Sequence, residues 1–240
     1  MYFRELVLTP SREEMGKWPD GKFLIDTVNA HSFVQAQDDK EFEKALLSAD
    51  ALIPDGISIV KAFKWLKLDN APKEKIAGAD LFTFEMERLN KKGGCCFFMG
   101  SSPAVLEAIR ERAAKEYPSI RIETFSPPFK DVLSEEDTKS ILEAIHKANP
   151  DLLWIGMTAP KQEKWLQQNW SRLEIHCHTG AIGAVFDFFA GTRRRAPEWW
   201  LKHGLEWFYR LILEPKRMWK RVFVSGPRFM MLVLKEKFSS

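Results

Sequence analysis

The sequence lacks long apolar runs and has little cysteine, so it offers neither a membrane-spanning segment nor a disulfide framework. The 240 residues contain no run of about eighteen apolar residues, and the N-terminus lacks the basic and then apolar order of a signal peptide. The three cysteines, Cys95, Cys96 and Cys177, have neither the spacing of a disulfide framework nor that of a zinc site. We therefore expect a cytoplasmic protein whose cysteines are reduced and buried.

The net charge is only +3, but the charged residues are distributed unevenly along the chain. Residues 193–240 hold twelve Lys or Arg against four Glu, whereas residues 1–192 hold 24 basic against 29 acidic residues. A mildly acidic body therefore carries a basic tail, and the position of this charge indicates more about partners than its total does.

Apolar runs alternate with amphipathic segments along the chain, which predicts an α/β fold with a Rossmann-like, mostly parallel sheet flanked by helices. We expect strands at 23–28, 51–53, 94–99, 152–155 and 175–179, and helices at 38–49, 104–116 and 134–148. The charge shift and the Arg195-Ala196-Pro197 break predict two parts. These are an α/β core at 1–195 and a helical, basic and aromatic C-terminal appendage at 196–240.

Ligands of open parallel sheets bind beyond the carboxyl ends of the strands, so polar residues that follow apolar runs form the candidate site. Thr27 and Asn29 end the first expected strand, where they either bond a sugar or phosphate or make ordinary strand-end hydrogen bonds. Asp55 follows the second strand in an Asp-Gly pair. This pair is a turn signal, but it also places one carboxylate where a general base of sugar transfer would stand.

Two further polar clusters could likewise serve either the local structure or a ligand. Asp80 follows Gly78 at an expected helix start and is either an N-cap or part of the site, while Lys75 is either solvated or turned toward a diphosphate. Turns of small residues at 100–103 and 156–163 each lead into a helix whose N-terminus favours anions. Neither turn has the spacing of a dinucleotide fingerprint or a Walker loop, so neither names its ligand.

We expect no metal and no other cofactor. His176 and His178 flank Cys177, but alternate residues of a strand face opposite ways, which separates Cys177 from both histidines. The sequence also has no Asp-x-Asp pair of the kind that holds a divalent ion on a diphosphate. The histidines are therefore expected to be structural.

Taken together, these segments resemble the WecG/TagA/CpsF glycosyltransferases of bacterial surface-polymer synthesis, over most of the chain. The segments that carry the resemblance are, in chain order, Thr27-x-Asn29, Pro54-Asp55-Gly56, Gly78-x-Asp80-Leu81, Asn149-Pro150-Asp151, Gly156 with Pro160-Lys161-Gln162-Glu163, Gly180-x-x-Gly183-x-x-Phe186-Asp187-Phe188-x-Ala190-Gly191, Arg195-Ala196-Pro197, Gly204-Leu205-Glu206-Trp207-Phe208-Tyr209-Arg210-Leu211 and Glu214-Pro215-x-Arg217.

The resemblance implies an inverting, metal-independent transfer from a UDP-sugar, often of the N-acetylmannosamine type, to an undecaprenyl-diphosphate-linked sugar. It implies that Asp55 is the general base and that Arg210 and Arg217 neutralise the leaving diphosphate in place of a metal ion. The residues assigned to substrate binding are Thr27, Asn29, Lys75, Asp80, Gln162, Arg210 and Arg217, and those assigned to the nucleotide are Gly100, Gly183 and Asp187.

Two positions depart from the family pattern. Lys75 stands where the family usually has Arg, so a bidentate grip on phosphate becomes a point charge. Ser58 stands in a Gly-x-Ser segment where the family often has Gly-x-Gly, which bears on the shape of the turn after Asp55. These departures leave the identity of the donor sugar open.

The tail mixes Trp and Phe with Arg and Lys, which suits the headgroup region of an anionic membrane, although a packed helical subdomain with a solvated basic face has the same composition. We expect peripheral association with the inner face of the cytoplasmic membrane and no nucleic-acid partner, since no recognised binding module is present. Two alternatives stay open, a UDP-sugar-modifying enzyme without a lipid acceptor and a non-catalytic membrane scaffold. The sequence leaves the oligomeric state open, a homo-oligomer included.

Overall fold

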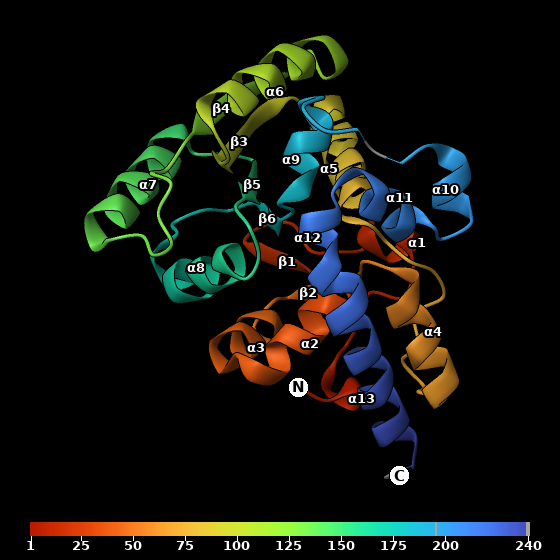
Figure 1. The fold of residues 1–240 in the computed structure, drawn as a ribbon. Coiled ribbons are helices and arrows are strands. Elements are labelled where there is room, and N and C mark those ends of the chain that lie inside the picture. The colour runs from red at the N-terminus through yellow and green to blue at the C-terminus, as the bar shows by residue number, and fades with distance from the viewer. Residues whose placement is uncertain (195, 239–240) are drawn as a thin grey trace.

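The computed structural model describes residues 1–194 and 196–238, and an all-parallel six-stranded sheet lies at its centre (Figure 1). The strand order is β2-β1-β6-β5-β3-β4. The strands are β1 (Phe23–Val28), β2 (Ala51–Pro54), β3 (Gly94–Gly100), β4 (Ile120–Phe125), β5 (Leu152–Gly156) and β6 (His178–Ala181). The predicted α/β fold with a parallel sheet is confirmed.

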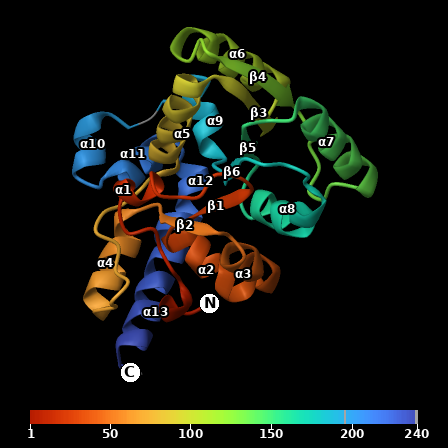
Figure 2. The same ribbon diagram turned by 180° about the vertical axis from the view of Figure 1, so that it is seen from behind.

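Helices cover both faces of the sheet because the central strands are apolar on both sides. In β3, Cys96 and Phe98 are buried in one core cluster, and Phe97 and Met99 are buried in another. The first face is covered by α5 (Gly78–Lys92), α6 (Pro103–Glu116) and α9 (Ala184–Phe189), and the second by α7 (Glu135–Ala148) and α8 (Lys161–Asn169), with α3 (Lys40–Leu47) beside α8 (Figures 1 and 2).

A third apolar cluster joins the two ends of the chain. The helix α13 (Gly226–Phe238) packs against α2 (Ala30–Asp38) and α4 (Ile57–Leu66), and the two termini lie in the same region of the molecule (Figures 1 and 2). The Phe229 ring is 5.7 Å from the ring of Phe3 and 5.6 Å from that of Phe33, between ring centroids. The C-terminal helix is therefore part of a core and not a loose tail.

The remaining C-terminal elements connect the core to α13. They are the helices α10 (Glu198–Lys202), α11 (Glu206–Leu213) and α12 (Pro215–Trp219), and a π-helical segment over Lys220–Ser225. The short helix α1 (Arg12–Met15) and 3-10 turns at Phe3–Glu5 and Trp170–Arg172 complete the described elements. The predicted division at 195/196 stays a prediction, and Arg195 itself lies outside the described residues.

Several predicted elements have different limits in the structure. The predicted helix at 38–49 is α3, which begins after Asp39 because the Asp39 side chain accepts from the Phe42 N–H at 3.0 Å and caps it. The predicted strand at 175–179 begins only at His178. The helix α2 and the strand β4 were not predicted. All three cysteines are free and buried, as predicted.

Across residues 1–194 and 196–238, no helix has both the length and the apolar character that crossing a bilayer would need.

The packing of α13 generates a stability prediction. Replacing Phe229, which is 2% exposed between two phenylalanine rings, by Ala is expected to lower the free energy of unfolding by about 3–5 kcal/mol, because it removes a buried ring and leaves a cavity. Met230 on the same helix is 56% exposed, and Met230→Ala should change it by less than about 0.5 kcal/mol. Urea unfolding measures both; equal effects would mean that α13 is not docked in solution.

Candidate active site

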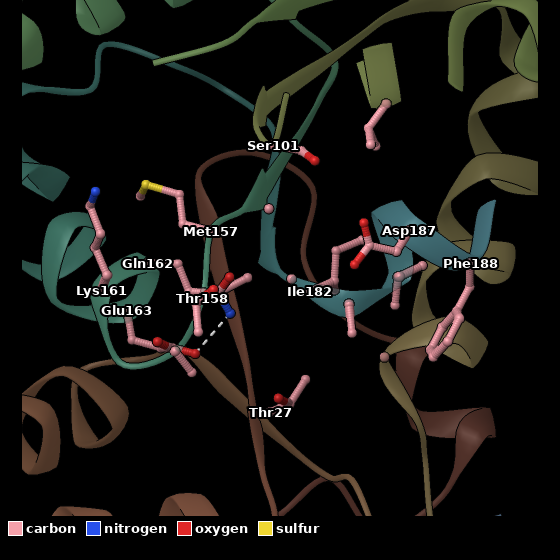
Figure 3. A pocket seen from close by; sticks show the side chains of 18 of the residues that line it. Thr27, Ser101, Met157, Thr158, Lys161, Gln162, Glu163, Ile182, Asp187 and Phe188 are labelled. Atoms are coloured by element: carbon pink, nitrogen blue, oxygen red, sulfur yellow. Dashed lines mark hydrogen bonds between the residues drawn. The ribbon is translucent and has the colours of Figure 1, made fainter. Parts of the chain in front are cut away.

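A cavity of about 880 Å³ opens where the parallel strands end. Residues at or just beyond the carboxyl ends of all six strands line it, since these ends meet at one edge of the sheet. They include Thr27 and Asn29 after β1, Asp55 after β2, Ser101 and Ser102 after β3, Ser126 after β4, Met157 and Thr158 after β5, and Ile182 and Gly183 after β6. Figure 3 shows Gln162 and Glu163 on one side of this cavity and Asp187 and Phe188 on the other.

Most of the predicted site residues meet in this cavity. Of the predicted set, the wall contains Thr27, Asn29, Asp55, Gln162, Gly183, Asp187, Arg210 and Arg217. Within the described part of the chain, Lys75, Asp80 and Gly100 lie outside this wall. The appendage contributes Arg210 and Arg217, so the C-terminal helices close over the ends of the core strands.

Asp55 follows β2 on the turn that precedes α4. Its backbone N–H donates to the Val28 carbonyl at 2.8 Å, and Gly56, with φ of 138°, makes the sharp turn that a side chain would strain. Burial raises the pKa of Asp55 to about 6; the charges of Glu206 and Asp80 add to this effect, and those of Lys75 and Arg210 oppose it. The carboxyl is therefore poised near neutrality, as a general base requires.

Asn29 serves the fold as well as the pocket. Its Oδ1 accepts from the N–H groups of His31 and Ser32, both at 3.0 Å, and so caps α2. Its amide nitrogen remains as the polar group available to a ligand. Thr27 precedes it and lies on the floor of the cavity in Figure 3.

Lys75 and Asp80 stand behind the cavity wall. Asp80 is the third residue of α5 and not its N-cap, which is Ala77; its side chain accepts from the Ala77 N–H at 2.9 Å and from Arg12 Nη2 at 3.0 Å, so it stabilises the helix start from inside the first turn. Lys75 Nζ lies 3.8 Å from Glu206 Oε2, an ion pair that joins the core to α11. Both residues act on Asp55 through their charges.

Of the three residues assigned to the nucleotide, the two glycines allow close packing of the backbone, and Asp187 carries a charge. A Cβ on Gly100 would lie 2.6 Å from the Gly156 carbonyl oxygen, so Gly100 allows β3 and β5 to end in close contact. Gly183 has φ of 30°, and a Cβ there would lie 2.9 Å from the Met157 carbonyl oxygen. Asp187 lines the cavity, and its Oδ2 forms an ion pair with Arg193 Nε at 3.1 Å.

Three arginines of the appendage, Arg210, Arg217 and Arg221, converge on the cavity. Burial and the charges of the other two lower the pKa of Arg221 to about 10, which still leaves it protonated at neutral pH. Arg210 Nε and Nη2 are buried and have no hydrogen-bond partner among the described residues, and Arg217 Nη1 meets Glu214 Oε2 at 3.2 Å. Buried donors without acceptors on a cluster of like charges indicate a site for an anion.

Sequence reasoning missed Arg221, Glu206 and Glu163 as pocket residues. A signal for Arg221 was present, because residues 210, 214, 217 and 221 follow helical spacing and so share one face. Glu163 and Glu206 stand in segments that carry the family resemblance, but neither was assigned a role in the pocket.

The predicted structural role of the histidine pair is confirmed for His178. It is 1% exposed, with Nδ1 2.9 Å from Glu85 Oε1 and Nε2 2.8 Å from the Pro19 carbonyl oxygen. In residues 1–194 and 196–238, no group of three or more His, Cys, Asp or Glu side chains is arranged to hold a metal ion.

Comparison with known proteins identifies similar sequences over most of the chain. The sequence model of the glycosyl transferase WecG/TagA/CpsF family matches residues 11–240. A Bacillus subtilis (strain 168) protein named N-acetylglucosaminyldiphosphoundecaprenol N-acetyl-beta-D-mannosaminyltransferase is 34% identical over 214 residues, which are 89% of this chain and 80% of that protein. A protein of the same name from Bacillus spizizenii is 30% identical over 220 residues, 92% of this chain and 81% of that protein.

The arginine cluster predicts binding of inorganic pyrophosphate. Pyrophosphate is expected to bind the wild-type protein in isothermal titration calorimetry without a metal ion, and Arg221→Gln to bind about tenfold more weakly or worse, because one charge-assisted hydrogen bond contributes about 1.5–3 kcal/mol. Arg228→Gln is the matched control, since Arg228 Nη2 pairs with Asp38 Oδ1 at 2.6 Å. Equal weakening in both variants would place the anion elsewhere.

Proposed function

The chain belongs to the WecG/TagA/CpsF family of glycosyl transferases, and on that premise we propose that it transfers a sugar from a UDP-sugar to a polyprenyl-diphosphate-linked sugar. Both curated relatives carry names with a diphosphoundecaprenol acceptor and an N-acetylmannosaminyl group, which supports an acceptor and a donor of these classes. The transfer serves the synthesis of a cell-surface polymer, and it inverts the anomeric centre without a metal ion.

One observation carries the proposal: Asp55, a carboxyl with a pKa near neutrality that directly follows β2, shares a cavity with three arginines, and buried nitrogen atoms of Arg210 have no hydrogen-bond partner among the described residues. A diphosphate leaving group needs positive charge as its bond to the sugar breaks, and Arg210, Arg217 and Arg221 provide it. A metal ion would fill the same role. The arginine cluster therefore supports chemistry in which the protein replaces the metal.

The geometry supports a direct displacement. Asp55 accepts the proton of the acceptor hydroxyl as the hydroxyl oxygen bonds to the anomeric carbon, and the bond to the UDP oxygen breaks on the opposite face. Thr27, Asn29 and Gln162 line the same cavity as the base and the arginines and would bind the sugars. Asp187 and Gly183 would face the nucleotide.

The appendage also supports approach to a lipid-linked acceptor. Among the described residues, its exposed large apolar side chains are Trp199, Trp207, Phe208, Ile212, Leu213, Trp219, Phe223, Val224, Met230, Met231, Leu234 and Phe238. Apolar side chains interleaved with Arg and Lys suit an anionic membrane surface. We propose peripheral attachment at the cytoplasmic face of the membrane, which would bring the cavity to an acceptor held in the bilayer.

Release of UDP tests the function. The purified enzyme is given a panel of UDP-sugars with and without a short-chain lipid-diphosphate-linked sugar, in EDTA. We expect acceptor-dependent UDP release that survives EDTA. Asp55→Asn should reduce turnover by about 10²–10⁴-fold while remaining folded, since it removes the general base.

The other outcomes of this assay are equally informative. Turnover of a UDP-sugar that is indifferent to acceptor and detergent would instead indicate a UDP-sugar-modifying enzyme. No release with any pair would favour a scaffold, and full activity of Asp55→Asn would remove Asp55 from the mechanism.

The pH dependence of kcat/KM provides a separate prediction. Because Asp55 acts in its ionised form and its pKa is about 6, protonation of Asp55 should lower kcat/KM about tenfold per pH unit below pH 6. Glu206 raises this pKa through its charge, so Glu206→Gln should move the acid limb to lower pH. An acid limb that stays in place in Glu206→Gln would show that Glu206 does not act on the base.

A further inference from the structure

A second set of buried carboxyls lies beneath the wall of the cavity, apart from Asp55. Asp26 is fully buried in β1, on the same side of the strand as Leu24, whose cluster includes Leu166 of α8. Glu163, in the first turn of α8, is 3% exposed and lines the cavity, and its charge acts on Asp26. One carboxyl therefore faces the cavity and the other stands behind it.

These carboxyls lack the partners that buried charges normally have. Among the residues that the structure describes, neither Oδ1 nor Oδ2 of Asp26 has a hydrogen-bond donor, and Glu163 Oε2 has none either. The hydroxyl of Thr179 in β6, the strand that pairs with β1, is likewise buried without a partner in the described part of the chain. Among the described residues, neither carboxyl has an ion pair, and the neighbouring Lys164 is turned to Asp39 at 2.6 Å.

Two negative charges cannot stay in such a place, so a proton is retained. Burial and the charge of Glu163 raise the pKa of Asp26 well above its usual value, and burial raises the pKa of Glu163 to about 7. Glu163 is the better holder of the remaining negative charge, because it accepts a hydrogen bond from Gln162 and sits in the first turn of α8. The proton accordingly belongs on Asp26.

The charge on Glu163 determines how the Gln162 carboxamide is turned. Gln162 Nε2 donates to Glu163 Oε1 at 2.9 Å (Figure 3). Its Oε1 is buried without a donor, and it is the end nearer to Gly183 of the cavity wall, since a Cβ on Gly183 would lie 3.2 Å from Oε1 and 3.7 Å from Nε2. An anion at Glu163 accepts only from the NH₂ group, so it holds the oxygen in this direction.

We propose that Asp26 and Glu163 are a positioning pair that shares one proton and holds the Gln162 carboxamide with its oxygen turned to a hydrogen-bond donor of the bound sugar. The group that Gln162 recognises is therefore a hydroxyl or an amide N–H, and a sugar that presents only an acceptor there is rejected. This inference rests on the proposed function, because it assigns a sugar to the cavity.

The proton is tested without turnover. Infrared spectra at pH 8, where Asp55 with its pKa near 6 is ionised, should show the carbonyl band of a protonated carboxyl in the wild-type protein. Asp26→Asn should remove this band. Glu41→Gln is the control and should leave the band intact. Glu41 is an exposed carboxyl of α3 that lies 3.4 Å from Lys164 of α8, the helix that contains Glu163. A wild-type protein without the band, or a band that survives Asp26→Asn, overturns the shared proton.

The positioning role is tested by a double-mutant cycle on kcat/KM for UDP release. Gln162→Ala and Glu163→Gln should each lose about tenfold, and the double variant should lose no more than Gln162→Ala alone, because Glu163 acts through Gln162. Losses that multiply would mean that Glu163 does not act through Gln162, and an unchanged Glu163→Gln would remove it from the site.

Circular dichroism and thermal melts establish that each variant of the cycle is folded. A wild-type enzyme that releases no UDP would contradict the proposed function, whereas the infrared band reports on the proton pair in either case. The two failures are thus distinguishable.

Discussion

Arg210, Arg217 and Arg221 repel one another across the cavity, and the docking of the C-terminal helices holds them there. Phe229 and Val233 bury α13 against the N-terminal part of the chain, and burying one such aromatic ring contributes about 3–5 kcal/mol. The free energy gained by packing α13 offsets the repulsion among the three arginines, which lie earlier in the same C-terminal segment. The site for an anion is therefore prepared before an anion arrives, as electrostatic catalysis requires.

The same docking sets the strength of the base. A carboxyl beside cations would ordinarily have a low pKa, yet burial and Glu206 together outweigh Lys75 and Arg210 at Asp55. The appendage brings both a carboxylate, Glu206, and a guanidinium, Arg210, to the cavity, so its charges act on Asp55 in opposite directions. In the proposed mechanism, the docked appendage thus adjusts the pKa of Asp55 and also supplies positive charge for the leaving group.

The sequence predicted β1, β2, β3 and β5 well because buried strands of a parallel sheet are continuous apolar runs, and 23–28 matches β1 at both ends. It missed α2, whose residues follow β1 directly after the cap Asn29 and carry little apolar periodicity. The site residues at strand ends were predicted because topology brings them together. Asp26 could not be, since a polar residue inside an apolar run reads as a surface position until its burial is known.

The two sets of buried carboxyls show why burial alone does not assign a role. Asp55 is surrounded by groups of both signs, so it titrates near neutrality and can exchange a proton with a substrate. The described charge that acts on Asp26 is that of Glu163, so burial and this charge keep the proton on Asp26. In the proposed arrangement the pair acts through Gln162, which donates a hydrogen bond to Glu163. The proposed roles of Asp55 as the base and of Asp26 and Glu163 as a positioning pair therefore follow from the different charges around them.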